Sequence, residues 1–213
     1  MRGLVRNNFY SMSSNIYLSF IIAAVLALVP AIFREALLTS MILAVQIFIF
    51  VVNTGASLRI DETSKWSKFE LTLPIRRHTI VSAKYVSFAI LILMGILSSL
   101  ITLAACYVTG LSLDPAIVTF SYGFGLTLAI TSVALMYPIM LKIGTEKNEL
   151  IVFFCGFVAI GIMLLLAALL APFTGGMQFR HPLVSIVSAC TSMLLFIISY
   201  LVSVRIHRTK EFR

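Results

Sequence analysis

Residues 36–77 read ALLTSMILAVQIFIFVVNTGASLRIDETSKWSKFELTLPIRR. The first part, residues 36–57, carries no charge, and about 20 apolar residues are enough to cross a hydrocarbon core of roughly 30 Å. The part that follows, residues 60–77, gathers acids, bases, a proline and the single tryptophan of the chain. This change predicts a membrane-spanning helix that ends in a charged loop at the membrane surface.

The rest of the chain repeats the pattern of long apolar runs and short polar connections. Its 213 residues are 60% hydrophobic and only 11% charged, which is far more apolar than a soluble domain. The first run has no cleavable signal pattern, so we interpret it as a retained span. We therefore predict an all-α integral membrane protein of one domain, residues 1–213, with six spans at 16–33, 36–57, 84–109, 115–141, 149–171 and 182–204.

The distribution of basic residues predicts the orientation, because short loops rich in Lys and Arg stay in the cytoplasm. With the N-terminus inside, only Arg34 and Arg180 of the 16 Lys and Arg residues lie outside. Both termini are therefore predicted to be cytoplasmic. The net charge of +8 is then an inner-face charge that attracts anionic lipid headgroups, and nucleic-acid binding is not needed to explain it.

The charged loop contains a predicted short amphipathic helix. Asp61 and Glu62 favour its N-terminal end, Asp61 has Lys65 one turn on as an ion-pair partner, and Pro74 ends it. Its apolar stripe consists of Trp66, Phe69 and Leu73, at positions i, i+3 and i+7. Such a helix either lies on the membrane or docks into the groove of a partner, and a solvated loop is the simpler alternative. The acidic residues weigh against adhesion to an anionic leaflet.

The N-terminal segment, residues 1–15, predicts a second interfacial helix. Val5, Phe9, Met12 and Ile16 recur at helical spacing, while the polar Asn8 and the basic residues lie on other faces. The alternative is a basic tail that only anchors the topology.

The spans carry no sign of catalysis. They hold no ionisable residue at mid-span, and the chain lacks hydrolase, metal-site and phosphate-loop motifs. We predict no catalytic residue and no metal site, so energy for any transport must come from another chain. Pairs of small residues four apart, such as Gly95 with Ser99 and Gly125 with Ala129, predict close helix packing.

One stretch carries a family resemblance. Residues 58–86, LRIDETSKWSKFELTLPIRRHTIVSAKYV, resemble the cytoplasmic loop of type-2 ABC transporter permeases, in particular a small Gram-positive subfamily. The similarity includes an acidic residue, an aromatic, a Leu-Pro-Ile turn and the sequence AKY at the start of the third span. The subfamily includes permeases of phenol-soluble modulin exporters and of related peptide or antibiotic-resistance exporters.

The resemblance implies how the protein works. Two permeases, identical or homologous, would sit in the cell membrane on an ATPase dimer that binds ATP and magnesium, while this chain binds no cofactor. Residues 1–15 would form an elbow helix and residues 58–83 a coupling loop, with the coupling helix from Asp61 to Leu73. The residues that would couple to the ATPase are Asp61, Glu62, Lys65, Trp66, Phe69, Glu70, Leu73, Pro74, Arg76 and Arg77.

The expected function is ATP-driven export of amphipathic peptides, toxins or membrane-active antibiotics. The short connection PFTGGMQFRHP between the last two spans argues against an elaborate extracellular domain. Two alternatives remain open at this point. One is the substrate-binding S-component of a vitamin importer, and the other is a non-transporting immunity or assembly protein.

Overall fold

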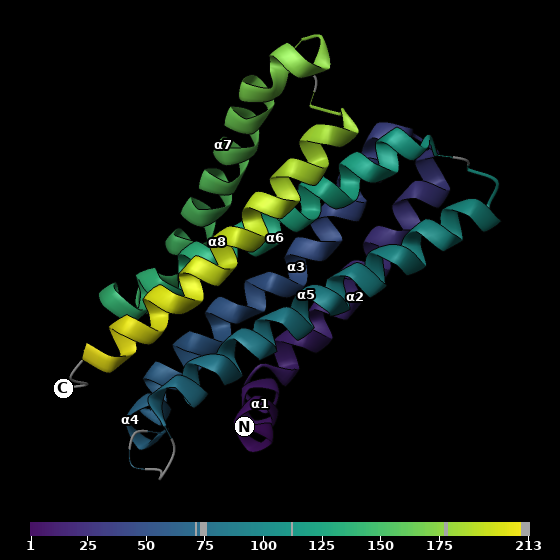
Figure 1. Ribbon diagram of the computed structural model, residues 1–213. Coiled ribbons are helices and arrows are strands. Elements are labelled where there is room, and N and C mark those ends of the chain that lie inside the picture. Colours follow the sequence, from purple (N-terminus) through teal and green to yellow (C-terminus); the bar gives the residue numbers. More distant parts are fainter. Residues whose placement is uncertain (71, 73–75, 112, 177–178, 210–213) are drawn as a thin grey trace.

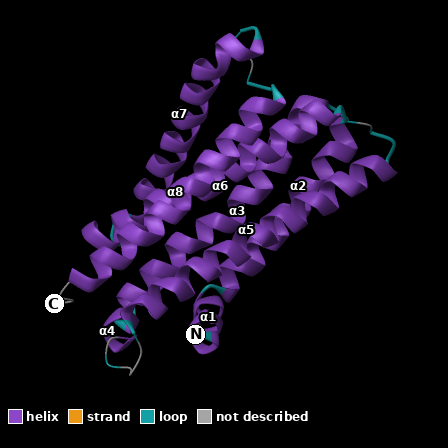
Figure 2. Cartoon of the chain, viewed as in Figure 1, coloured by secondary structure: helices purple, strands orange, loops and turns teal. Residues whose placement is uncertain are grey.

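The computed structural model describes residues 1–70, 72, 76–111, 113–176 and 179–209. Helices and loops make up this part of the chain, without strands (Figure 2). The helices are α1 (Arg2–Ser11), α2 (Ser13–Phe33), α3 (Ala36–Thr63), α4 (Trp66–Glu70), α5 (Arg77–Val108), α6 (Pro115–Ile143), α7 (Asn148–Thr174) and α8 (Pro182–Thr209).

The six long helices, α2, α3, α5, α6, α7 and α8, are each long and apolar enough to cross a membrane. They coincide with the six predicted spans, so the all-α, six-span prediction is confirmed. Most extend beyond the predicted limits, and α3 continues six residues past residue 57, to Thr63. Helix α1, helix α4 and the last turn of α8 lie at one end of the bundle (Figure 1), which is the end that the basic residues assign to the cytoplasm.

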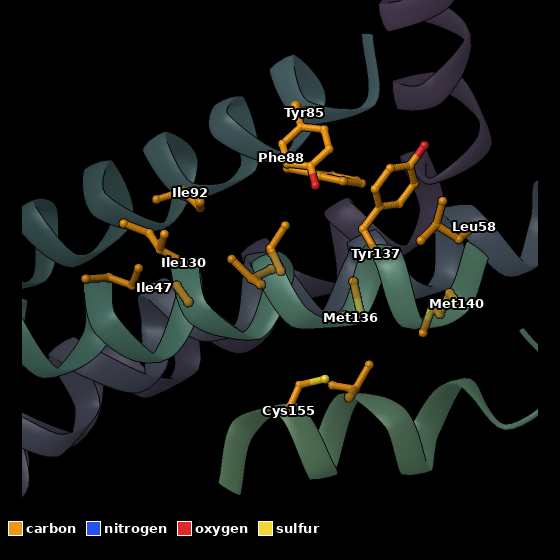
Figure 3. Close-up of a cluster of buried hydrophobic side chains, with 14 of the residues drawn as sticks. Ile47, Leu58, Tyr85, Phe88, Ile92, Ile130, Met136, Tyr137, Met140 and Cys155 are labelled. Atoms are coloured by element: carbon orange, nitrogen blue, oxygen red, sulfur yellow. The ribbon is translucent and has the colours of Figure 1, made fainter. Parts of the chain in front are cut away.

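Helices α3 and α6 form the centre of the bundle. In the most apolar 18-residue stretch of each helix, 56% of α3 and 61% of α6 is buried inside the bundle. The corresponding share for α2, at the periphery, is 22%. Ile47 and Val51 of α3 pack with Val133 and Tyr137 of α6 and with Phe88 of α5 in one cluster (Figure 3). The bundle interior is therefore filled with side chains, and the chain by itself encloses no wide central channel in the part described.

Two glycines allow the central helices to approach closely. A Cβ atom on Gly95 of α5 would lie 2.8 Å from both Cα and the carbonyl oxygen of Ile47, and one on Gly125 of α6 would lie 2.9 Å from Cα of Ala44. Real side chains do not tolerate such distances to backbone atoms. The packing role predicted for both glycines is therefore confirmed, with α3 as the common partner.

Replacing Gly95 with alanine is therefore expected to force α3 and α5 apart and to cost about 1–3 kcal/mol of unfolding free energy. The matched control is Gly161→Ala in α7, where an added Cβ meets no atom within 4 Å. Alanine also favours helix over glycine, so the control is expected to be neutral or slightly stabilising. Thermal unfolding in detergent compares the two, and equal midpoints would contradict the close α3–α5 contact.

Candidate functional site at the cytoplasmic end

The loop between α3 and α5 contains a shorter helix than the sequence predicts. Asp61 and Glu62 belong to the last turn of α3, so the prediction that they begin a separate helix was wrong. Lys65 adopts a left-handed conformation with φ 58°, which separates α3 from the five residues of α4. The predicted residues Leu73 and Pro74 lie outside the described part of the chain.

Asp61 is buried, with only 3% of its surface exposed, and forms an ion pair with Lys84 of α5. The predicted local pair with Lys65 is therefore wrong, since Lys65 is exposed in the turn. The physical reason is that a buried carboxylate requires a buried positive partner, which an exposed lysine does not supply. Lys84 is 4% exposed and comes from the next span.

Asn8 completes this group from the N-terminal helix. It is 1% exposed, its Oδ1 accepts a hydrogen bond of 2.6 Å from Lys84 Nζ, and its Nδ2 donates to Ser87 Oγ at 3.0 Å. The sequence places Asn8 only as a polar residue off the apolar stripe, and in the structure its side chain accepts a hydrogen bond from the ammonium group of Lys84. We call Asn8, Asp61, Lys84 and Ser87 the Lys84 cluster.

The Lys84 cluster fixes α1 on the bundle. Below it, Met12 and Ile16 are buried against Leu91, with Phe9 packed beside them. The apolar stripe predicted for the N-terminal segment therefore exists, but much of it contacts α5 and not lipid. As a result, α1, α3 and α5 share one buried polar junction at their cytoplasmic ends.

Helix α4 presents two different faces. Glu70 is buried, and it accepts a hydrogen bond of 2.6 Å from Trp66 Nε1. Burial raises the pKa of Glu70 above 4.5, against the opposing effects of the Lys84 charge and the Trp66 bond. Phe69 is 52% exposed, and its ring centroid lies 5.2 Å from that of Trp66. The α4 helix thus joins a buried acidic residue to an exposed aromatic one.

Glu62 connects the end of α3 to the second cytoplasmic loop. Its Oε2 accepts hydrogen bonds from the backbone N–H of Thr145, at 2.8 Å, and from the Thr145 hydroxyl. Thr145 lies between α6 and α7, directly after Gly144, whose φ of 96° favours glycine. The two cytoplasmic loops are therefore held together at the end of α3.

Arg76 and Arg77 take separate roles at the start of α5. Arg76 is exposed at the N-cap position. Arg77 donates hydrogen bonds to the carbonyl oxygens of His207, at 3.2 Å, and Arg208, at 2.9 Å. These carbonyls belong to the last turn of α8, which carries the negative end of the helix dipole. Arg77 thus joins α5 to α8.

A cavity of about 190 Å³ lies among these groups. Asp61, Glu62, Glu70 and Lys84 line it together with Tyr137 of α6. No group of three metal-binding side chains occurs among the described residues. Around the cavity, Asp61 pairs with Lys84, while Glu62 bonds to Thr145 and Glu70 bonds to Trp66.

The structure divides the ten predicted coupling residues into groups. Lys65, Phe69 and Arg76 are exposed, Trp66 is half-buried, and Asp61 and Glu70 face the interior. Sequence reasoning missed Asn8, Lys84 and Thr145 as members of the site. For Lys84 a signal existed, because a lysine within an apolar helical run requires a nearby acidic partner.

Six apolar spans around a packed centre, with paired charges at one end, define an integral multi-pass membrane protein. The family model described as "ABC-2 family transporter protein" matches residues 3–208, and the chain belongs to this family. It is thus the membrane permease component of an ABC-2 transporter, a class that has no ATPase domain of its own and generally pairs with an ABC ATPase. Comparisons with curated proteins and with solved structures gave no match.

Proposed function

We propose that this chain is the permease subunit of an ATP-driven exporter that moves amphipathic peptides, related toxins or membrane-active antibiotics out of the cell. A separate ATPase dimer supplies the energy by hydrolysing ATP with magnesium. The observation that carries the proposal is α4, a short helix with an exposed aromatic residue on one face and a buried acidic residue on the other.

Energy coupling follows from this geometry. Exposed aromatic residues that fill a pocket on a partner contribute most of the binding energy of many interfaces. Phe69 is placed to act in this way, with Lys65 and Arg76 exposed on the same loop. Because Ser67 and Glu70 of α4 lie beside Asp61 and Lys84 around one cavity, a displacement of α4 is transmitted to α3 and α5. The Asn8 contact extends the effect to α1.

A second permease is part of the proposal. The central helices α3 and α6 fill the bundle, so a large substrate requires a path between two permeases, which are identical or homologous. A complex with two permeases and two ATPase subunits is therefore expected.

The substrate class is supported by a groove that opens toward the lipid between α2, α3 and the start of α7. Its volume is about 550 Å³. Near its cytoplasmic mouth lie Asn15, Asn148 and the pair Arg59 and Glu149, which approach to 4.0 Å. Farther along α2 and α3, the lining residues Ile22, Ile49 and Val52 are apolar.

This groove matches an amphipathic molecule that enters sideways from the inner leaflet. Asparagine amides both donate and accept hydrogen bonds, as peptide groups require. The apolar part accommodates hydrophobic side chains without the desolvation cost that a hydrophilic solute would have. The opposite charges of Arg59 and Glu149 offset each other. The cytoplasmic mouth of the groove therefore does not select for a strongly charged ligand.

The test is ATPase stimulation of the permease and ATPase complex in liposomes. An amphipathic helical peptide is expected to raise ATP turnover, while a scrambled peptide of equal composition, a sugar and a vitamin are not. Val52→Trp fills the groove and should reduce the stimulation, whereas Leu97→Trp on the lipid-facing side of α5 is the matched control.

Other results would favour the alternatives. Stimulation by a water-soluble vitamin alone, together with loss of uptake in cells lacking the gene, would favour the importer component. Failure of any ATPase to co-purify with the intact permease would favour a non-transporting immunity or assembly protein.

A further inference from the structure

A second groove lies between the start of α5 and the end of α8, away from the Lys84 cluster. It has a volume of about 570 Å³ and is lined by His78, Tyr200, Leu201, Val204, Arg205 and Arg208. Arg205 and Arg208 are exposed. Within residues 1–70, 72, 76–111, 113–176 and 179–209, neither guanidinium group forms an ion pair with a carboxylate. Among the described residues, the groove therefore carries net positive charge.

Contacts between α5 and α8 fix the shape of this groove. His78 lies in the first turn of α5, at the positive end of that helix dipole, while the last turn of α8 brings the negative end of its dipole to the same groove. Arg77 bonds to the last carbonyl groups of α8, and Tyr200 shares a hydrogen bond of 2.9 Å with Ser82. These contacts hold the two helices together on both sides of the groove, so the basic groups are presented by a rigid pair of helices.

The groove changes from basic to apolar along α8. Arg205 and Arg208 lie in the final turns of the helix, while Leu201 and Val204 lie nearer to mid-membrane, and Leu201 is 61% exposed. A soluble partner does not reach an apolar side chain at membrane depth. A phospholipid does, because its phosphate lies at the interface and its acyl chain extends into the hydrocarbon.

We propose that this groove is a binding site for an anionic phospholipid of the inner leaflet. The phosphate lies against Arg205 and Arg208, and an acyl chain follows Leu201 and Val204. The contrast with the groove at Arg59 is one of charge, since Arg59 has Glu149 as its partner and the groove on α8 has only cations among its described charged residues. The bound lipid joins α5 to α8 directly after the loop that contains α4.

The test measures lipid binding to the purified chain in detergent by native mass spectrometry. Phosphatidylglycerol is expected to bind in preference to phosphatidylcholine. Arg205→Gln combined with Arg208→Gln should weaken phosphatidylglycerol binding about 30-fold, as expected for the loss of two basic contacts at an anionic surface. The matched control, Lys142→Gln with Lys147→Gln, removes the same charge from the end of α6 and the start of α7 and should retain binding.

A further variant distinguishes loss of lipid binding from misfolding of the double arginine variant. Val204→Trp fills the apolar part of the groove and leaves both arginines in place, and it should also weaken phosphatidylglycerol binding. Equal binding by wild type and the double arginine variant would overturn the proposal, as would equal losses in the lysine control. Displacement of the lipid by millimolar inorganic phosphate would instead indicate a site for free phosphate and would also overturn it.

Discussion

Replacing Lys84 with methionine is expected to destabilise the protein by about 3–5 kcal/mol, the largest single effect that the structure predicts for stability. The reason is that Asp61, which is only 3% exposed, loses the positive partner of its buried carboxyl group. Asn8 loses a hydrogen bond at the same time. Thermal unfolding in detergent and the yield of folded protein measure the effect.

A double-mutant cycle separates the ion pair from simple loss of packing. Asp61→Asn alone should also be destabilising, while the double variant Asp61→Asn and Lys84→Met should lose less than the sum of the two single changes. Lys142→Met, at the cytoplasmic end of α6, is the control for removal of a lysine outside the buried pair. Strict additivity would show that the carboxylate and the ammonium group do not depend on each other.

Replacing Phe69 with alanine is expected to weaken binding of the ATPase by about 2 kcal/mol, or about 30-fold, while leaving the permease folded. Phe69 is half-exposed on α4 and contributes little to the described core, so its truncation leaves the fold intact. Co-purification of the ATPase at increasing stringency, and ATP-driven transport in liposomes, measure the loss.

The control for this prediction is Phe173→Ala, which removes an exposed phenylalanine from the opposite end of the bundle. Trp66 is a less clean target because its indole also bonds to Glu70, so its removal disturbs α4 itself. ATPase binding and transport at wild-type levels in the Phe69 variant would show that α4 does not couple the two subunits.

The six spans could be predicted because their signal is local. Length and hydropathy are enough to place a helix in a membrane, and the bias of basic residues is enough to orient it. The packing role of Gly95 and Gly125 was also predictable from spacing, but the partner helix was not. That both glycines contact α3 depends on how the six helices are arranged, which no local pattern contains.

The candidate site was predictable only in part, because its contacts join distant segments. A short loop with acids and bases favours a local pair of Asp61 with Lys65, four residues apart. The actual partner, Lys84, lies 23 residues away, and Asn8 comes 76 residues before it. The end of α3 was predicted too early for the same reason, since charged residues can continue a buried helix when another span neutralises them.

The position of Lys84 also has a consequence for biogenesis. A ribosome delivers this chain to the membrane from its N-terminus, so Asn8 and Asp61 arrive before the residue that binds both of them exists. Until α5 enters the bilayer, the Asp61 carboxylate is without its ammonium partner, and low polarity disfavours its burial. The third span to be synthesised therefore supplies the ammonium group that binds both Asp61 and Asn8.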